Sequence, residues 1–358
     1  MVNTDLTEIL FKLAERSDLS REESQRTFGA MLDGHVSSEC MAAFLMALRV
    51  KGTTREELLG AVKALRVRMR HFPSVPEKAV DVCGTGGDRY GTLNISTAVA
   101  FVLAGLGVPV VKHGNRAVSS RSGASDILSA LRVPFILDPE AHITLLREYR
   151  IVFLAASQYC PAMSHITAIR KTLVLPTLFN IMGPLVNPAG VTRQLVGVFS
   201  CQWLELMVDV LRMLGSEHVW AVCSMPLGEI RGVDELTLAG PTHVVALERG
   251  HYSRFTIDPE MAGFTYAPIE ALQGGDPAYN AEMLEALLRG ASGVYRDTVL
   301  LNAACALHVA GKTTVLRQGC IDPSALQKSV AMAAFSLDSG RAWAVLKGLR
   351  SFSTMMEK

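Results

Sequence analysis

The 358-residue sequence has no long uninterrupted apolar run and no surplus of one charge. Its longest apolar stretch, residues 98–111, is broken by Gly105, Gly107 and Pro109, whereas a membrane-spanning helix needs about 20 consecutive apolar residues. The N-terminus has acidic residues where a secretory signal peptide would have positive charge. We therefore expect neither a membrane segment nor a signal peptide.

Cysteine pairs and basic tracts are also missing. The seven cysteines are odd in number, widely spaced and without a CxxC pair, so we expect reduced, mostly buried thiols in a cytoplasmic protein. Lys and Arg total 35 against 34 Asp and Glu, and the resulting net charge of +1 argues against a polybasic nucleic-acid-binding protein. A composition of 49% hydrophobic and 19% charged residues excludes disorder.

The first 70 residues show helical spacing of apolar residues and no strand signals. Ser20 with Glu23 forms a capping-box pattern before one helix, and Gly34 and Gly52 are typical helix ends. The sequence predicts a small bundle of four short helices over residues 1–72.

From residue 79 onward, short β-rich runs alternate with helical stretches. They cover residues 79–83, 108–112, 151–155, 194–199, 218–224 and 243–248. Such alternation predicts βαβ units and a mainly parallel central sheet flanked by helices. We expect an α/β fold with a small N-terminal helical domain (1–72) and a larger α/β domain (79–162 and 189–358). Segment 163–188 breaks the alternation.

The densest chemical signal follows the first predicted strand. Gly84, Gly86 and Gly87 precede Asp88, and Ser96 and Thr97 then open an apolar helix. Glycines let a backbone approach a ligand closely, and a helix N-terminus offers free N–H groups to phosphate. The pattern matches neither GxxxxGK[ST] nor GxGxxG, which argues against a nucleotide triphosphatase or a Rossmann dehydrogenase. A plain strand-to-helix turn is the alternative.

A second polar cluster follows the next predicted strand. Its members carry side-chain hydrogen-bonding groups: Lys112, His113, Asn115, Arg116, Ser119, Ser120, Arg121 and Ser122. Ligands bind at the carboxyl ends of strands in open α/β sheets, so we expect these residues at a site. Further along, the adjacent carboxylates Asp234 and Glu235 suit Mg²⁺, and Arg170 could hold a planar carboxylate. Taken singly, each of these is also compatible with an ordinary surface loop or helix.

Taken in order, the motifs resemble one known family. GTGGD (84–88), NIST (94–97), KHGNR (112–116), SSRSGASD (119–126), FNIMGPLVNP (179–188) and the Asp-Glu pair (234–235) follow the pattern of the anthranilate phosphoribosyltransferases. The resemblance extends over nearly the whole chain. It implies transfer of the phosphoribosyl group of phosphoribosyl pyrophosphate (PRPP) to the amine of anthranilate, in tryptophan biosynthesis. It also implies a homodimer formed through the helical domains, with segment 163–188 returning to that domain.

The resemblance further implies a site in the cleft between the two domains. The positions that match the family's PRPP contacts are Gly84, Gly86, Gly87, Asp88, Thr92, Asn94, Ser96, Thr97, Lys112, His113, Gly114, Asn115, Ser119 and Ser120. Anthranilate is expected near Gly84, Asn115 and Arg170, and the cofactor Mg²⁺ at Ser96, Asp234 and Glu235. No residue is assigned as acid, base or nucleophile, because the aromatic amine is already neutral at pH 7 and a covalent enzyme intermediate is not expected.

The sequence departs from the family pattern at five positions. Ala124, Cys160, Val174, Pro176 and Arg231 replace the usual serine, histidine, glycine, arginine and acidic residue. Three of these adjoin the expected acceptor segment. We therefore expect PRPP binding to be intact and handling of the acceptor to be altered, with ordinary drift at tolerant positions as the alternative.

Two other functions stay open at this point. A pyrimidine nucleoside phosphorylase shares this architecture, but the NIST stretch and the Asp-Glu pair favour a magnesium–pyrophosphate ligand. A paralogue that uses the fold only for binding, or with another acceptor, is the second alternative. No nucleic-acid or membrane partner is expected.

Overall fold

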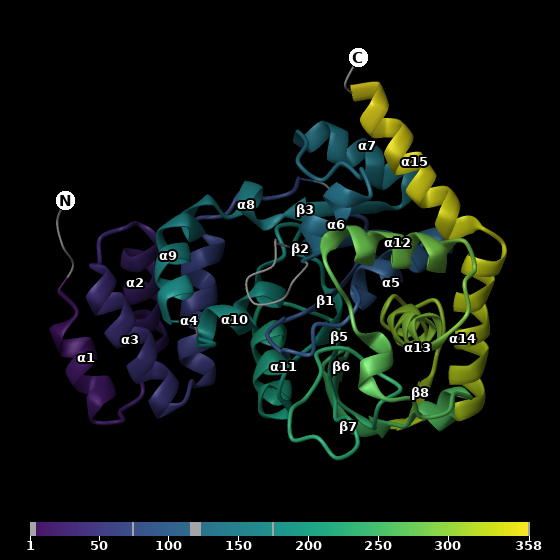
Figure 1. The fold of residues 1–358 in the computed structure, drawn as a ribbon. Helices are drawn as coiled ribbons and strands as arrows, with labels where there is room; N and C mark the ends of the chain where they lie inside the picture. The colour runs from purple at the N-terminus through teal and green to yellow at the C-terminus, as the bar shows by residue number, and fades with distance from the viewer. Residues whose placement is uncertain (1–4, 74, 115–122, 174, 357–358) are drawn as a thin grey trace.

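The computed structural model describes residues 5–73, 75–114, 123–173 and 175–356. A small bundle of helices near the N-terminus lies beside a larger part built around a sheet (Figure 1). The arrangement is the α/β fold with a small helical part that the sequence predicts.

Capping residues mark the start of α2 and the ends of α2 and α3 among the N-terminal helices, as the sequence predicts. They are α1 (Thr7–Ala14), α2 (Arg21–Leu32), α3 (Ser38–Lys51) and α4 (Arg55–Arg66). Ser20 before α2 and Thr54 before α4 each complete a capping box, with Glu23 and Glu57 respectively. Gly52 ends α3 with φ of 94°, a conformation that glycine adopts without strain.

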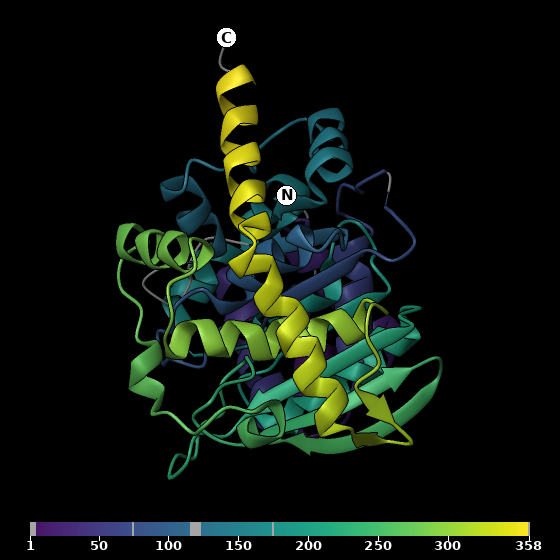
Figure 2. The same cartoon turned by 90° about the vertical axis from the view of Figure 1, so that its right-hand side faces the viewer.

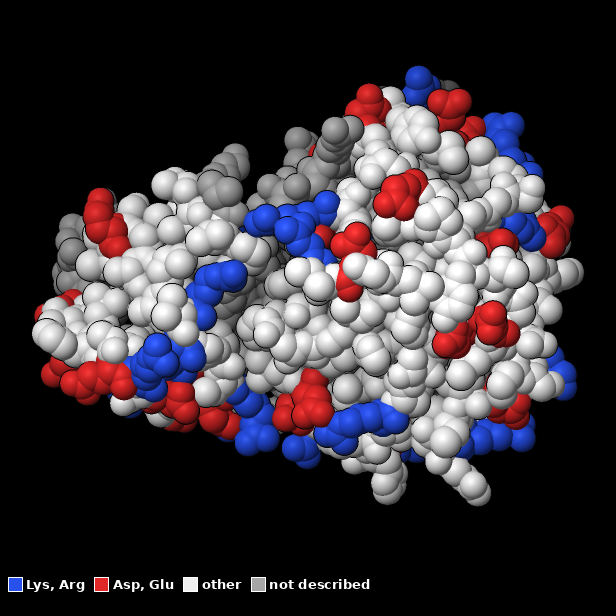
Figure 3. All heavy atoms as spheres, turned by 60° about the horizontal axis from the view of Figure 1, so that its bottom comes forward, with Lys and Arg blue, Asp and Glu red and all other residues white. Residues whose placement is uncertain are grey.

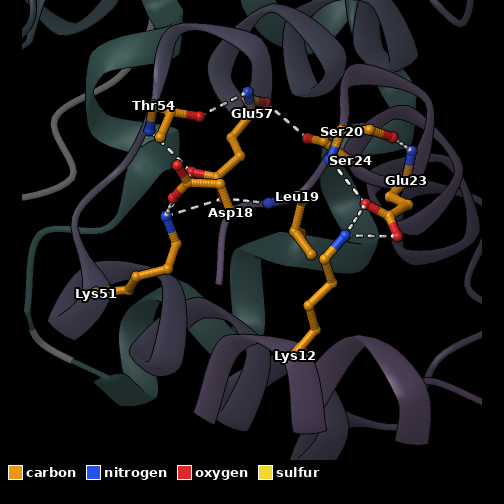
Figure 4. A network of polar contacts seen from close by, with 9 residues as sticks. All are labelled: Lys12, Asp18, Leu19, Ser20, Glu23, Ser24, Lys51, Thr54 and Glu57. Carbon is orange, nitrogen blue, oxygen red and sulfur yellow. Dashed lines mark hydrogen bonds and ion pairs between the residues drawn. The ribbon is translucent and has the colours of Figure 1, made fainter. Parts of the chain in front are cut away.

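A buried carboxylate ties this bundle together (Figure 4). Glu57 is fully buried, and its carboxylate accepts hydrogen bonds from the N–H groups of Leu19 (2.9 Å) and Thr54 (2.8 Å). Lys51 Nζ lies 3.0 Å from Glu57 Oε1 and 2.6 Å from Asp18 Oδ1. Because a buried charge is costly unless it is paired, these contacts fix the α1–α2 connection against α3 and α4.

Segment 163–188 packs on the same bundle. It contains α9 (Ser164–Leu173), α10 (Leu178–Met182) and the 3₁₀ turn η2 (Gly183–Val186). α9 contacts α2 and α3, and α10 contacts α4. The Arg66 guanidinium donates to the Leu185 carbonyl at 2.8 and 3.0 Å, which fixes the end of α4 to this segment.

The larger part is organised around a seven-stranded sheet of order β3-β2-β1-β4-β5-β6-β7. The strands are β1 (Val80–Gly84), β2 (Val110–Gly114), β3 (Ile151–Ala155), β4 (Arg193–Gly197), β5 (His218–Ser224), β6 (Thr242–Glu248) and β7 (His251–Ile257). β3, β2, β1, β4 and β5 run parallel, whereas β6 and β7 pair antiparallel. The sheet is therefore mainly parallel, as predicted.

Helices cover both faces of the sheet. One face carries α5 (Ile95–Gly105) and α13 (Val294–Val309), behind which lie α14 (Pro323–Asp338) and α15 (Arg341–Met356). These C-terminal helices lie across one side of the sheet in Figure 2. The other face meets α11 (Leu204–Met213) and joins the core of the bundle. The remaining elements are α6 (Ala124–Ala130), α7 (Pro139–Tyr149), α8 (Ala156–Tyr159), α12 (Pro277–Leu288), the turns η1 (Pro161–Met163), η3 (Cys201–Trp203), η4 (Pro259–Ala262) and η5 (Ile269–Leu272), and the hairpin β8 (Leu316–Arg317) with β9 (Cys320–Ile321).

The surface carries both signs of charge. On the face in Figure 3, Lys and Arg side chains are interspersed with Asp and Glu, in keeping with the net charge of +1. In the described part of the chain, no helix has both the length and the apolar character needed to cross a bilayer.

Candidate active site

A cavity of about 720 Å³ lies between the helical bundle and the carboxyl ends of the parallel strands. The bundle side contributes Leu65 of α4, Arg170 of α9 and Asn180 of α10. The sheet side contributes the last residues of two neighbouring strands, Gly84 of β1 and Gly114 of β2. This is the sheet edge at which open α/β folds bind ligands.

The glycines after β1 are required by their surroundings. A Cβ added at Gly84 would overlap the Asp234 carboxylate, and one at Gly197 would overlap the Asp234 backbone. Gly86 and Gly87 have φ of 69° and 86°, which other residues rarely adopt. The Gly86 N–H donates to Asp234 Oδ2 at 2.6 Å. The loop is thereby held directly against the Asp-Glu pair.

Helix α5 directs its first turn at the same cavity. Asn94 occupies the N-cap position, Ser96 and Thr97 lie in the first turn, and all three line the cavity. The Ser96 N–H donates to Glu235 Oε1 at 3.1 Å. The buried Lys112 donates from Nζ to Ser96 Oγ at 3.1 Å and to the Val82 carbonyl. A helix N-terminus with an adjacent ammonium group is suited to bind phosphate.

Three carboxylates share this region with few compensating charges. Burial, followed by the charge of Asp234, raises the pKa of Asp88 to about 8. The same two causes raise the pKa of Glu235 to about 8, and burial raises the pKa of Asp234. The charge of Lys112 and hydrogen bonds from neighbouring groups lower the pKa of Asp234 and Glu235 only in part. An added cation would relieve this repulsion.

The expected magnesium ligands are adjacent, but they do not form a preformed cage. Ser96 lies beside Glu235, and Asp234 directly precedes Glu235 in the sequence. Among the described residues, no group of three His, Cys, Asp or Glu side chains is placed to hold a metal ion. Mg²⁺ usually takes one or two carboxylates and completes its coordination with water and substrate phosphates, so the residues present fit a substrate-bridged ion.

The remaining residues that were expected to contact PRPP lie around the same cavity. Thr92, His113 and Gly114 line the cavity, as do Gly86, Gly87 and Asp88. Burial lowers the pKa of His113 to about 4, so its ring is neutral at pH 7. A hydrogen bond to the Gly183 backbone raises that pKa in part, which indicates that the imidazole holds the β2 end against η2. The predicted contacts Asn115, Ser119 and Ser120 lie outside the described residues.

The opposite wall combines one cation with apolar side chains. Arg170 is half-buried, and burial lowers the pKa of its guanidinium. In the part of the chain that the structure describes, no carboxylate forms an ion pair with Arg170. Met163, Phe179 and Met182 line the cavity with it. An unpaired guanidinium among apolar groups suits a flat aromatic acid.

The five departures from the family pattern fall in different places. Cys160 is buried and lines the cavity, and so does Ala124. Pro176 lies outside the cavity lining, and its carbonyl accepts a hydrogen bond from Arg49. Arg231 is exposed, and its carbonyl accepts from Tyr90 Oη at 3.1 Å. Val174 lies outside the described residues.

Sequence reasoning missed two buried residues beneath the site. Asp81, the second residue of β1, accepts from Asn187 Nδ2 at 2.8 Å, and the same amide donates to the Val111 carbonyl at 2.9 Å. Burial raises the pKa of Asp81. These contacts link β1, β2 and the end of segment 163–188. The sequence signal that could have indicated this contact is Asp81 itself, a single carboxylate within an apolar strand.

Comparisons with known proteins agree with this geometry. A family model described as "Glycosyl transferase family, helical bundle domain" matches residues 7–69, and one described as "Glycosyl transferase family, a/b domain" matches residues 76–342. The anthranilate phosphoribosyltransferase of Gluconobacter oxydans is 52% identical, with 98% of this chain and 96% of that protein covered. That of a Bradyrhizobium species is 47% identical, with 98% and 99% covered.

Solved structures of the same enzyme superpose on the chain. The anthranilate phosphoribosyltransferase of Thermus thermophilus has a TM-score of 0.84 and 36% identity, covering 96% of this chain and 99% of that one. The Saccharomyces cerevisiae enzyme, described as a complex with PRPP and Mg, has a TM-score of 0.84 and 25% identity, covering 98% of both chains. These names support the transferase and not the phosphorylase or the purely binding alternatives. The chain therefore belongs to the anthranilate phosphoribosyltransferases, the glycosyltransferases that take part in tryptophan biosynthesis.

Proposed function

We propose that the cavity between bundle and sheet binds PRPP against the glycine loop and α5, and anthranilate against Arg170. The observation that carries this proposal is the meeting of both residue sets in one cavity. In this arrangement the N–H groups of the α5 first turn and Lys112 Nζ face the phosphates. The products are N-(5-phosphoribosyl)anthranilate and pyrophosphate.

The chemical step is displacement at C1 of the ribose. The anthranilate nitrogen forms a bond to C1, the C1–oxygen bond breaks, and pyrophosphate leaves with the electron pair while the nitrogen loses a proton. Lys112 and the backbone N–H groups stabilise the charge that grows on the leaving group. Arg170 orients the acceptor, and orientation of two reactants can contribute about 7–11 kcal/mol. No side chain needs to form a covalent bond to the ribose.

Magnesium fits the donor side of this site. Ser96, Asp234 and Glu235 would hold it, because these oxygen ligands lie together and Lys112 compensates the charge of the carboxylates only in part. When bound, Mg²⁺ neutralises charge on the pyrophosphate and so makes it a better leaving group. Asp88 adds a further carboxylate beside Asp234.

The first experiment follows the fluorescence of anthranilate with purified protein, PRPP and Mg²⁺. We expect the signal to fall as anthranilate is consumed, with matching release of pyrophosphate, and the reaction to stop when a chelator is added. Binding of PRPP without any change in fluorescence would mean another acceptor. Phosphate-dependent cleavage of thymidine would point to the phosphorylase instead.

Altered handling of the acceptor is part of the same proposal. Cys160 lies in the cavity wall, where the family pattern has histidine. We expect Cys160→His to change the KM for anthranilate and to leave the KM for PRPP as it is. Equal KM values for anthranilate in the two proteins would favour ordinary drift at this position.

Three broader predictions stay attached to this function. We propose a homodimer formed through the helical bundle, where Phe11 of α1 and Val50 of α3 are exposed apolar residues. We also propose the domain division 1–72 with 163–188, and 79–162 with 189–358, which the contacts of α9 and α10 with the bundle support. A cytoplasmic location remains a prediction.

A further inference from the structure

One contact joins the donor-binding loop to a distant helix. Asn94, at the start of α5, lines the cavity, and Asn280 lies in α12 with only 2% of its surface exposed. The Nδ2 group of Asn280 donates to Oδ1 of Asn94 at 3.0 Å. Asn280 itself is not among the residues that line the cavity.

The orientation of both amides follows from a third group. The backbone N–H of Gly275 points at one atom of the Asn280 amide at 2.8 Å. A backbone N–H can only donate, so that atom is the oxygen and the Asn280 NH₂ group faces Asn94. The Asn94 atom that receives it is therefore an oxygen. The NH₂ group of Asn94 is left as the part of this amide available to the cavity.

The same contact changes the start of helix α5. An asparagine at the N-cap position ordinarily accepts a hydrogen bond from an N–H group of the first turn. Asn94 makes no such bond, and its side-chain oxygen accepts from Asn280 instead. Glu235 accepts from the Ser96 N–H of this turn, so the Thr97 N–H is the group of the first turn left for an anion.

The backbone around Asn94 is held by the same region of the chain. Tyr295 Oη donates to the Asn94 carbonyl at 3.2 Å. The Leu93 N–H donates to the Leu272 carbonyl at 2.8 Å, and the Gly274 N–H donates to the Gly91 carbonyl at 2.8 Å. The loop cannot shift easily to compensate for a change in the amide pair.

We propose that Asn280 is a positioning residue for the donor substrate: it fixes the Asn94 amide with its NH₂ group toward the cavity and keeps the α5 N-terminus free for a phosphate of PRPP. The inference rests on the proposed function, since it concerns the same donor site. Asn280 touches neither substrate and acts only through Asn94.

The test replaces Asn280 by a group of the same shape that cannot donate. In Asn280→Asp the carboxylate still accepts from Gly275 but can no longer donate to Asn94. The Asn94 amide then turns to donate to it and presents its oxygen to the phosphates. We expect the Kd for PRPP with Mg²⁺, measured by calorimetry, to rise about 10- to 100-fold, because a hydrogen bond to a charged group contributes about 1.5–3 kcal/mol.

Two further readouts separate positioning from a general loss of structure. The KM for anthranilate at saturating PRPP should not change. The defect relative to the unmodified protein should shrink at lower pH, because the introduced carboxyl group can donate again once it is protonated. A variant that was merely unstable would not recover on acidification.

Ser336→Ala is the matched control. Ser336 donates from Oγ to the Val102 carbonyl at 2.8 Å, so it holds the same helix α5 but away from the cavity. Its loss should lower the Tm and leave the Kd for PRPP unchanged. If Asn280→Asp does not fold, Asn280→Ala removes the same donor and should weaken PRPP binding several-fold.

The outcomes distinguish an error in the role given to Asn280 from an error in the proposed function. If the unmodified protein binds PRPP with Mg²⁺ and the Asn280 variants bind it equally well, the role given to Asn280 is wrong. If the unmodified protein does not bind PRPP at all, the proposed function itself is wrong.

Discussion

Individual residues show why the site was predictable only in part. The glycine loop, the start of α5 and Lys112 are contiguous stretches, so sequence motifs indicate them directly. The clustering of Asp88 with Asp234 and Glu235 needs the fold, which brings two distant stretches together. Asn280 carried no signal, because an asparagine in a helix is unremarkable until its partner Asn94 is known.

Gly84 offers a direct test at the scale of a residue. A side chain at this position would overlap Asp234 Oδ2, so Gly84→Ala must displace the carboxylate expected to hold Mg²⁺. A misplacement of about 1 Å in such a site can cost ~100-fold in rate. We expect kcat/KM for PRPP to fall by about that factor, and the dependence on Mg²⁺ concentration to shift upward, in steady-state assays.

Gly29→Ala is the control for Gly84→Ala. Its added Cβ would also meet a flexible side chain, the Arg68 guanidinium at 2.9 Å, but in the helical bundle away from the cavity. Its kinetics should match those of the unmodified protein. Unchanged magnesium dependence in Gly84→Ala would contradict the role given to Asp234.

At the scale of elements, the strength of the apolar pattern decided what the sequence could predict. β1 to β6 are buried runs, and each lies within two residues of its predicted start and end. β7 was not predicted, since its residues His251–Ile257 are mostly half-buried or exposed and mix polar with aromatic side chains. The β8–β9 hairpin has only two residues per strand, too few for a periodic signal.

The Glu57 network gives a prediction about the helical bundle. Glu57→Gln keeps the shape of the side chain but leaves Lys51, whose side chain is only 4% exposed, with Asp18 as its remaining acidic partner. Breaking a buried ion pair costs about 3–5 kcal/mol. We expect the bundle to unfold at lower urea concentration by far-UV circular dichroism. The three tryptophans, Trp203, Trp220 and Trp343, lie outside the bundle, so their fluorescence transition should move less.

Glu23→Gln is the matched change in the neighbouring helix. Glu23 completes the capping box of α2 and pairs with Lys12 at 2.8 Å, but this pair is near the surface. A pair of that kind contributes at most about 1 kcal/mol. Equal shifts in the two variants would show that burial of Glu57 does not add to the stability of the bundle.

In the whole molecule, the proposed active-site cavity and the proposed dimer contact lie in different places. The cavity lies where the bundle meets the sheet, whereas α1 and α3 form the end of the bundle remote from the sheet (Figure 1). Because the cavity and the proposed dimer contact lie apart in the fold, each can be changed by mutation without altering the other.

Mutations at the exposed apolar residues of the bundle are expected to abolish the dimer and to keep the activity. Phe11 and Val50 are 68% and 71% exposed, and they lie on α1 and α3, which contact each other. We expect the double variant Phe11→Glu with Val50→Glu to sediment as a monomer and the unmodified protein as a dimer, with Mg²⁺-dependent activity kept in both. Leu227→Glu with Ile230→Glu is the control: these apolar residues of the larger part are 66% and 94% exposed, and this variant should stay dimeric. If the unmodified protein sediments as a monomer, the proposed dimer is refuted. If the double variant is still a dimer, the dimer contact lies elsewhere, because an apolar interface cannot bury two unpaired carboxylates on each side.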